Sequence, residues 1–458
     1  MSQKLIKGGT VVSMDADIGT GALDVLVEDD TITRVDRDIM APRAEVIDAS
    51  NAIVSPGFID THRRVWQTQL RSVATDWSLF DYFVQMRSIY SGFYNAEDVY
   101  LGNHIGVLEA LNAGITTVVD HCHILNSPEH TDCALRGHLD AGIRSVFCYG
   151  TFGNPTHWGP KPDLAEDWRI ADARRTARTL DEHPLVTFGF APQEVTAMPF
   201  GAACEEIAFA RELGAHRISC HVSMGRYDNG FEFVRQLGDA GLLGQDLLFV
   251  HGSTLTETEL GMMADSGAAV SVTPETELQM AMGHPVAVRA QAAGVRTSLG
   301  IDIVSNYSGD MQAQMRLLLQ AQRGAENEQL EGPPKKIRFS ANEVLTLATM
   351  GGATSLGWEE KLGSLTPGKQ ADIVVTRCDD INMVPSIDPV GLLVLNANPS
   401  NVDTVLVAGE YRKRDGQLVG VDWPDLRDRL RASSARIVEG FESVDLAALE
   451  AQLGGMVS

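Results

Sequence analysis

The stretch IVSPGFIDTHRRVWQ, residues 53–67, combines an apolar run, a turn at Pro56-Gly57 and a second apolar run that ends in a histidine. Side chains two positions apart lie on the same side of a β-strand, so residues 62 and 64 face the same way. A metal-binding strand places two ligands at such positions. Here the first is His62 and the second is Arg64. The stretch predicts a strand that leads into a functional site, and it leaves open whether a metal centre was lost or rebuilt.

Short apolar runs like this one recur along the chain, with helical stretches between them. There are eight: IVSPGFIDTH, TTVVDHCH, RSVFCYG, VTFGFAP, HRISCHV, LLFVHG, AAVSVTP and RTSLGID. Strands that are apolar on both faces and alternate with helices indicate a parallel sheet. Eight of them predict an α/β fold of the (β/α)₈ TIM-barrel type, with the barrel over residues 56–361.

Both ends of the chain are rich in short alternating β segments, and neither end could form a convincing core alone. Residues 1–55 and 362–420 are therefore expected to pair into one composite β-sandwich domain. The remaining residues, 421–458, read as an amphipathic helical segment. Such a helix would pack on a neighbouring subunit or on the barrel's own flank, and a homo-oligomer is expected.

Composition excludes several classes of function. The chain of 458 residues has 37 Lys and Arg against 61 Asp and Glu, a formal net charge of −24. This charge would repel nucleic acids and anionic membranes, so neither is an expected partner. The N-terminus lacks the apolar core of a signal peptide, and no later run reaches membrane-spanning length, which predicts a cytoplasmic protein. The six cysteines form no CxxC pair and read as reduced, buried thiols.

Polar residues at the C-terminal ends of the predicted strands are the candidates for chemistry, because barrel active sites lie there. They are His62, His121, His123, Glu194, His221, His251 and Asp302. Any one of them alone is more often a packed structural residue, but together they converge on one mouth. Imidazoles and a carboxylate suit zinc, whose bound water becomes a nucleophile near neutral pH. Asp302 could accept a proton from that water, and His251 could polarise the bond under attack.

Further residues are candidates for contact with a small-molecule substrate. Trp66 and Gln67 follow the first strand, although a tryptophan packed under a loop is an equally good explanation. One of His121 and His123 is expected to play a supporting or structural part. The full set of candidate substrate-binding residues is Trp66, Gln67, His123, His157 and Glu194.

The chain resembles the amidohydrolase superfamily over roughly residues 1 to 420. The resemblance rests on the PGFIDTH entry, the strand-end histidines 221 and 251, the Gly-Ile-Asp at 300–302 and the segment LTPGKQADIVV. The branch it resembles holds triazine chlorohydrolases and guanine, cytosine and S-adenosylhomocysteine deaminases. The resemblance implies a metal-bearing barrel in which His62, His221 and Asp302 match metal ligands. It also implies that His251 matches a histidine that contacts substrate or water.

Two departures from the pattern of that branch bear on the chemistry. Arg64 stands where the second histidine of His-x-His belongs, and a guanidinium is permanently cationic with no lone pair for a metal. Met224 stands where the deaminases carry a proton-shuttling glutamate, and a thioether cannot move protons. The expected cofactor is one zinc or other divalent ion, weakly held or absent because of Arg64. Arg64 would either pair with Asp302 in place of the metal or turn outward to bind an acidic group of the substrate.

Three functions are left open by the sequence. The first is an amidohydrolase-like hydrolase that uses an activated water on a C–N or related bond of a small cyclic or aromatic molecule. The second is a metal-independent lyase, isomerase or hydratase on the same barrel, with Arg64, Asp302 and His251 as its catalytic residues. The third is a non-catalytic binding protein.

Overall fold

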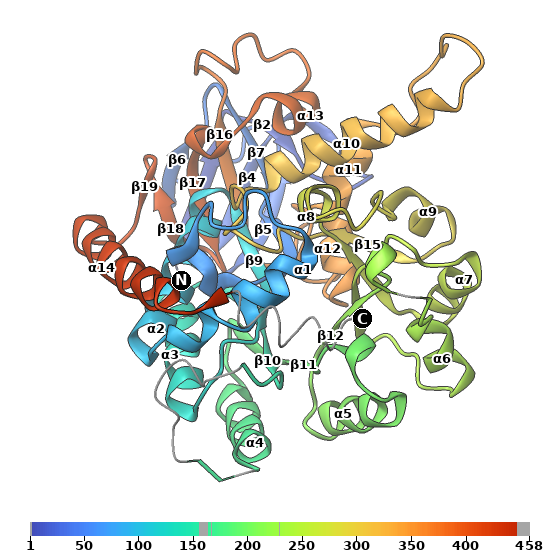
Figure 1. Ribbon diagram of the computed structural model, residues 1–458. Coiled ribbons are helices and arrows are strands. Elements are labelled where there is room, and N and C mark those ends of the chain that lie inside the picture. The colour runs from blue at the N-terminus through green and yellow to red at the C-terminus, as the bar shows by residue number, and fades with distance from the viewer. Residues whose placement is uncertain (1, 155–163, 166, 229, 447–458) are drawn as a thin grey trace.

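The computed structural model describes residues 2–154, 164–165, 167–228 and 230–446 (Figure 1). Its centre is an eight-stranded sheet with the strands in sequence order, each parallel to the next. These strands are β8 (Phe58–Arg63), β9 (Ile115–Cys122), β10 (Arg144–Gly150), β11 (Val186–Ala191), β12 (Ile218–Val222), β13 (Leu247–His251), β14 (Ala269–Val272) and β15 (Arg296–Leu299). The predicted (β/α)₈ barrel is confirmed.

The barrel closes where β8 meets the segment that follows β15. The backbone N–H of Asp302 donates to the carbonyl of His62 at 2.8 Å, and the N–H of Arg64 donates to the carbonyl of Asp302 at 2.7 Å. These two backbone hydrogen bonds place Asp302 beside His62 and Arg64 without any contribution from side chains. The seam of the barrel is therefore also the place where its main polar residues meet.

The opening stretch of the sequence forms two strands that belong to different sheets. β7 (Ala52–Pro56) lies in a seven-stranded sheet outside the barrel, and β8 begins two residues later. Gly57 joins them, and a Cβ at this position would lie only 2.1 Å from the Thr116 hydroxyl oxygen. The break at Pro56-Gly57 thus marks the passage of the chain from one sheet to the other.

Two sheets are built from the ends of the chain. A four-stranded sheet has the order β5-β4-β1-β6. The seven-stranded sheet has the order β19-β18-β17-β16-β7-β2-β3, so that four C-terminal strands join three N-terminal strands where β16 pairs with β7. The N-terminal strands are β1 (Gln3–Lys7), β2 (Thr10–Val12), β3 (Thr20–Ala22), β4 (Asp24–Glu28), β5 (Thr31–Asp36) and β6 (Glu45–Asp48). The C-terminal strands are β16 (Ile373–Arg377), β17 (Val402–Val407), β18 (Glu410–Arg414) and β19 (Gln417–Leu418). The prediction was one composite β-sandwich built from both chain ends, and the structure has additional sheets at those ends. The domain boundaries at residues 55, 361 and 420 remain predictions.

Helices follow the barrel strands along the chain and lie around the outside of the barrel (Figure 1). The longer ones are α2 (Ala96–Asn112), α3 (Pro128–Ala141), α4 (Trp168–Leu180), α5 (Phe200–Glu212), α7 (Glu257–Ser266) and α10 (Met311–Glu328). Shorter ones are α1 (Leu79–Asp81), α6 (Phe233–Asp239), α8 (Pro274–Gln279), α9 (Ala287–Ala292), α11 (Ala341–Leu347), α12 (Met350–Ser355) and α13 (Pro389–Gly391). Single turns of 3-10 helix form η1 (Val65–Leu70), η3 (Tyr90–Phe93), η4 (Val195–Ala197), η5 (Gly225–Tyr227) and η7 (Pro399–Asn401), and π-helical turns form η2 (Tyr82–Arg87) and η6 (Leu392–Asn396).

The closing helix α14 (Trp423–Glu442) packs on the flank of its own barrel. It contacts α2, η1 and η3, with Leu426, Ser433 and Ile437 buried. The Phe441 ring stacks on Tyr90 with ring centres 4.0 Å apart. The sequence left two places for this helix, a neighbouring subunit or the flank of its own barrel. In this structure the helix lies on the flank of its own barrel.

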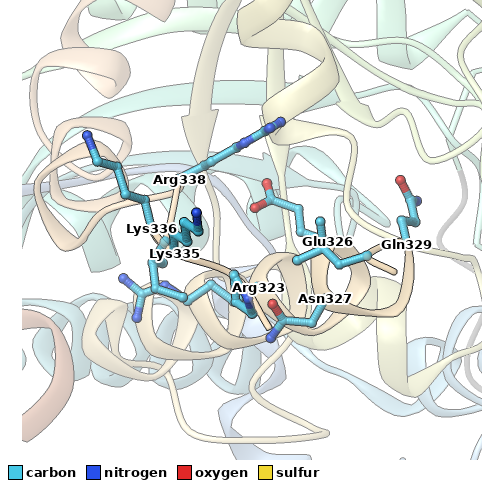
Figure 2. Close-up of a pocket in the computed structure, with 10 residues that line it drawn as sticks. Arg323, Glu326, Asn327, Gln329, Lys335, Lys336 and Arg338 are labelled. Atoms are coloured by element: carbon cyan, nitrogen blue, oxygen red, sulfur yellow. The ribbon is translucent and has the colours of Figure 1, made fainter. Parts of the chain in front are cut away.

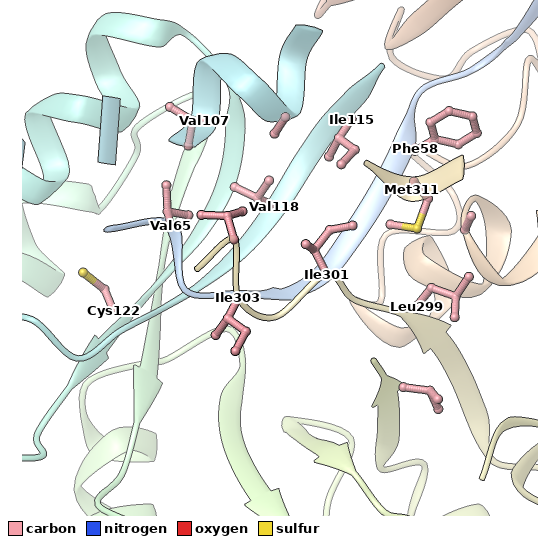
Figure 3. Close-up of a cluster of buried hydrophobic side chains, with 14 of the residues drawn as sticks. Phe58, Val65, Val107, Ile115, Val118, Cys122, Leu299, Ile301, Ile303 and Met311 are labelled. Carbon is pink, nitrogen blue, oxygen red and sulfur yellow. The ribbon is translucent and has the colours of Figure 1, made fainter. Parts of the chain in front are cut away.

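The largest hydrophobic cluster runs through the barrel and its surrounding helices, from Val12 of β2 to Ile437 of α14. Figure 3 shows Phe58, Ile115 and Val118 together with Leu299 and Ile301. The six cysteines are free thiols. No helix among the described residues combines the length and the apolar character needed to cross a membrane.

Candidate active site

Five buried polar residues converge at the C-terminal end of the barrel. His62 ends β8, His121 lies near the end of β9, His221 and His251 end β12 and β13, and Asp302 follows β15. Each is at most 3% exposed. One nitrogen of each of His62, His121 and His221 lies within 4.8 Å of the others, an arrangement that could hold a metal ion. The site predicted from the strand ends is thus physically assembled.

The guanidinium of Arg64 lies in the middle of this cluster. It forms an ion pair with the Asp302 carboxylate, and its Nη2 is 2.8 Å from His221 Nε2. His62 Nε2 is 3.3 Å from the same carboxylate. Because residues 62 and 64 share one side of the strand, Arg64 reaches the point to which the histidines are directed. One of the two arrangements expected for Arg64, pairing with Asp302, is the one in this structure.

Glu194 supports His221 from the side opposite to Arg64. Its Oε2 lies 3.0 Å from His221 Nδ1, and its Oε1 lies 4.0 Å from the guanidinium of Arg87. The carboxylate accepts the proton of Nδ1, which leaves a lone pair on Nε2 pointing at the centre. Glu194 was predicted to bind substrate, and that role stays a prediction; in this structure its carboxylate is positioned to orient His221.

Burial favours the neutral form of the central imidazoles. Burial, and then the charge of Arg64, lowers the pKa of His62 and of His221 well below the ordinary value. Burial, and then the neighbouring His221, does the same to the pKa of His121. Burial and then Arg64 also lower the pKa of His251 to about 3. Neutral imidazoles carry the lone pair that metal binding or proton acceptance requires.

Two of these residues adopt backbone conformations that side chains rarely take. The φ angle is +75° at His251 and +73° at Asp302. Non-glycine residues with positive φ are uncommon, and they cluster at functional sites where the surrounding structure holds them in place. At Asp302 the two seam hydrogen bonds supply that support.

The free space beside the cluster is small, about 10 Å³. Its walls include Met224, Met280 and Met282 on one side and Leu79, Tyr82 and Phe83 on another. Such a volume holds about one water molecule, whereas ligand pockets typically measure a few hundred Å³. A ring-sized substrate therefore needs more space than this structure leaves between the two walls.

A larger hollow of about 590 Å³ lies elsewhere, at the end of α10 (Figure 2). Its charged lining residues are Arg323, Glu326, Lys335, Lys336 and Arg338. It shares no lining residue with the space at the barrel mouth. It contains none of the residues predicted to carry chemistry.

The predicted substrate-binding residues occupy different positions around the centre. Trp66 Nε1 donates to His123 Nδ1 at 3.0 Å, and both side chains are buried. Gln67 donates to the Tyr82 hydroxyl at 2.6 Å and accepts from Ser305 at 2.7 Å. The hydrogen bonds of Gln67 thus hold the wall of the pocket. His157 lies outside the described residues.

Sequence reasoning left three neighbours of the centre without a role. His121 was noted as a strand-end histidine but not as a ligand, and its position at the end of β9 was the signal for it. Arg87 and Glu277 were not singled out. Both are fully buried ionisable residues, 1% and 0% exposed, that belong to the short helical segments η2 and α8. No local pattern distinguishes such residues from ordinary surface charges.

The donor set at the centre fits a divalent metal ion. Three neutral imidazoles and one carboxylate are the ligands that zinc takes in proteins. His62 Nδ1 has no hydrogen-bond partner among the described residues, while Nε2 is directed at Asp302. Arg64 is the one feature that opposes the ion, since its guanidinium would have to leave Asp302.

Comparison with known proteins places these features in a family. The Amidohydrolase family profile matches residues 53–412. The 5-methylthioadenosine/S-adenosylhomocysteine deaminase of Symbiobacterium thermophilum is 29% identical, over 96% of this chain and 100% of that protein. The enzyme of the same name from Pyrococcus furiosus is 27% identical, over 93% and 98%.

Solved structures share the fold. An adenosine deaminase from Xanthomonas campestris with bound zinc superposes with a TM-score of 0.85 at 24% identity, covering 96% of this chain and 99% of that one. An atrazine chlorohydrolase from Arthrobacter aurescens TC1, complexed with zinc, superposes with a TM-score of 0.81 at 23% identity, covering 94% and 100%. At these identities the likeness establishes the fold.

The family match covers the barrel and much of the sheet that joins the two chain ends. It confirms the predicted resemblance, and with it the prediction of an enzyme that hydrolyses a C–N or related bond of a small molecule. The family match and the histidine cluster together support a divalent metal. This chain belongs to the amidohydrolase family and is a hydrolase of that family.

Proposed function

We propose that this enzyme hydrolyses a bond between a ring carbon and a nitrogen or other leaving group in a small nitrogen-containing ring compound. The observation that carries the proposal is the convergence of four side chains at the C-terminal end of the barrel. They are His62, His121, His221 and Asp302. The relatives support the substrate class, because they are named for deamination of adenosine derivatives and for hydrolysis of a triazine.

Zinc is the metal we propose, held by His62, His121, His221 and Asp302. In this assignment His121 of β9 supplies the imidazole that Arg64 cannot. When bound, the ion would lower the pKa of a water molecule so that hydroxide forms near neutral pH. Glu194 contributes by fixing the His221 lone pair toward the centre.

The remaining steps fall to residues of the pocket. Asp302 accepts the proton of the attacking water, and His251, which lines the pocket, takes up a proton at Nε2 or contacts the leaving group. Met224, Met280 and Met282 offer an apolar, adaptable wall for a flat ring. Because Met224 cannot protonate a ring nitrogen, we propose that proton transfer runs through His251 and Asp302.

A second candidate function rests on the ion pair between Arg64 and Asp302. A buried guanidinium balances the charge of Asp302 and could act as a fixed positive charge without any metal. In that case Arg64, Asp302 and His251 would serve a lyase, isomerase or hydratase reaction. The two candidates differ in whether activity depends on a metal ion.

The test combines metal analysis with a substrate screen. The purified protein is analysed for zinc, then assayed before and after chelation against a panel of amino-, chloro- and alkylamino-substituted pyrimidines, purines and triazines. Turnover that is lost on chelation and restored by zinc supports the first candidate. Turnover that survives chelation, in protein free of metal, supports the second. Binding without turnover across the panel would contradict both and leave a binding protein.

Assembly and location rest on the sequence alone. Homo-oligomer formation and a cytoplasmic location stay predictions. Sedimentation at micromolar concentration, giving a mass of one chain or a multiple of it, tests the first.

A further inference from the structure

A buried carboxyl group, that of Glu277, lies directly behind His251. Glu277 belongs to α8, the short helix that follows β14, and its side chain is 0% exposed. Its Oε1 accepts hydrogen bonds from the backbone N–H of Thr273 at 2.8 Å and from the Thr273 hydroxyl at 3.3 Å. Its Oε2 has no hydrogen-bond partner in the part of the chain that the structure describes.

Thr273 connects this carboxyl to the catalytic histidine. Its hydroxyl oxygen lies 2.9 Å from His251 Nδ1, and the Glu277 oxygen lies 3.7 Å from the same nitrogen. A hydroxyl group has a single hydrogen to donate. Once that hydrogen is given to Glu277, the oxygen can only accept a hydrogen from His251.

The protonation states of Glu277 and His251 agree with a Thr273 hydroxyl that donates to Glu277 and accepts from His251. Burial raises the pKa of Glu277 to about 8 and lowers the pKa of His251 to about 3, which favours the neutral form of each group. Oε1 of Glu277 already accepts a short bond from a backbone N–H, which places the acid proton on Oε2. The other charged or titratable groups that act on this pair are His284 at Glu277 and Arg64 and Glu194 at His251.

We propose that Glu277, acting through Thr273, holds His251 in the tautomer with its proton on Nδ1 and a lone pair on Nε2. Glu277 is then a positioning residue, and His251 presents a proton acceptor to the pocket rather than a donor. The proposal rests on the proposed function for the identity of the pocket. It gives this chain a support for proton transfer that does not depend on a carboxylate at position 224.

The tautomer can be measured without a substrate. Full-length protein labelled with ¹⁵N-histidine is stripped of metal and examined at pH 7 by long-range ¹H–¹⁵N correlation, with His251 assigned from its loss in His251→Gln. The expected result is a single form with Nδ1 protonated and Nε2 unprotonated. An Nε2-protonated or mixed form in the unmodified protein would overturn the proposal.

Variants separate positioning from simple packing. Thr273→Val keeps the shape of the side chain and removes the hydroxyl, so the single tautomer should be lost. Glu277→Gln keeps an oxygen that can accept both hydrogen bonds, so the tautomer should be retained. An unchanged His251 spectrum in Thr273→Val, or loss of the tautomer in a folded Glu277→Gln protein, would contradict the role given to Glu277.

Glu275 offers a matched control on the same helix. Burial raises its pKa to about 8 as well, but its carboxylate accepts from Gln314 at 2.6 Å and not from Thr273. Glu275→Gln should therefore leave the His251 signals unchanged. A change of the same size as in Thr273→Val would show that the tautomer responds to any perturbation of α8, which would refute the proposal.

A kinetic comparison follows once the screen supplies a substrate. Thr273→Val should lower kcat by roughly 10-fold or more with little change in KM, because it disturbs the proton acceptor and not the pocket wall. The NMR measurement of the His251 tautomer does not depend on this kinetic result. A confirmed tautomer in a protein that hydrolyses none of the heterocycles would refute the proposed function and leave the role of Glu277 intact.

Discussion

At the scale of single residues, Arg64 sets the charge balance of the barrel centre. Its guanidinium is 5% exposed and satisfies the Asp302 carboxylate, while its Nη2 meets the nitrogen of His221 that a metal would need. A cation among neutral imidazoles opposes a second cation by direct repulsion, and the burial of these residues leaves that repulsion weakly screened. The affinity for metal is therefore expected to depend on this one side chain.

Replacing Arg64 by histidine tests that dependence. Arg64→His removes the competing charge and completes the His-x-His pair with His62, so zinc content should rise toward one equivalent from a lower value in the unmodified protein. Elemental analysis after gel filtration measures it, with Arg87→Lys as a control that keeps the neighbouring charge. A full equivalent of tightly held zinc in the unmodified protein would show that Arg64 yields its position readily and serves the substrate instead.

Asp302 is the carboxylate common to both candidate mechanisms. Asp302→Asn should lower kcat by roughly 100-fold or more, since the amide can neither accept the proton nor balance a cation. Stability should also fall, by about 3 kcal/mol, because Arg64 would stay buried without its partner. Steady-state kinetics and urea unfolding measure the two effects.

The control for this variant is Asp310→Asn, at the N-cap of α10, where asparagine caps as well as aspartate. It should change neither quantity. Near-normal activity in Asp302→Asn would show that the base lies elsewhere.

At the scale of elements, α14 illustrates how the terminal helix supports the active-site end of the barrel. Ile437 is fully buried, and the helix packs on η1, the turn that follows the strand carrying His62 and Arg64. Ser434 donates from its hydroxyl to the carbonyl of Gln69, which ties the helix to the end of that turn. Loss of the helix would therefore remove packing from η1, the segment that follows His62 and Arg64.

Ile437→Ala should lower the free energy of unfolding by about 2–5 kcal/mol through lost burial and the cavity left behind. Thermal and urea unfolding measure this loss. Arg431→Ala, at a residue 73% exposed in its side chain on the same helix, is the matched control and should have little effect. Equal stability of the two variants would show that α14 contributes little to the packing of the folded chain.

At the scale of the whole molecule, the buried histidines make stability depend on pH. Burial lowers the pKa of His62, His121, His123, His221 and His251. In the unfolded chain these groups take up protons as pH falls through about 6.5, while the folded chain keeps them neutral. Their contribution to stability is present above pH 6.5 and is lost as pH falls toward the folded-state values.

Each such group removes up to about 1.4 kcal/mol per pH unit below pH 6.5. Glu275 and Glu277, whose pKa is raised to about 8, act in the opposite direction as pH rises from about 4.5, but there are fewer of them. Metal-free protein should therefore be less stable at pH 5 than at pH 6.5, as measured by urea unfolding at both values. Equal or greater stability at pH 5 would mean that the central histidines are protonated in the folded protein.

The architecture was available from the sequence because it depends on repeated local patterns. Eight apolar runs separated by helical stretches indicate a parallel sheet buried on both faces, and eight such strands are typical of a closed barrel. The strand-end positions of His62, His221, His251 and Asp302 follow from the same patterns. Family resemblance added the expected ligand roles, and it also made Arg64 and Met224 visible as departures.

Tertiary structure decided which polar groups touch, because hydrogen-bond partners come from strands far apart in the chain. The seam between β8 and the segment after β15 brings Arg64 to Asp302, and β9 brings His121 to His62 and His221. Neither pairing leaves a trace in local sequence. The support of His251 by Thr273 and Glu277 likewise appears only when the ends of β13 and β14 lie side by side. The sequence alone determined the barrel and the strand ends that face its mouth. The partners at that mouth depend on distances of about 3 Å, which only the closed barrel sets.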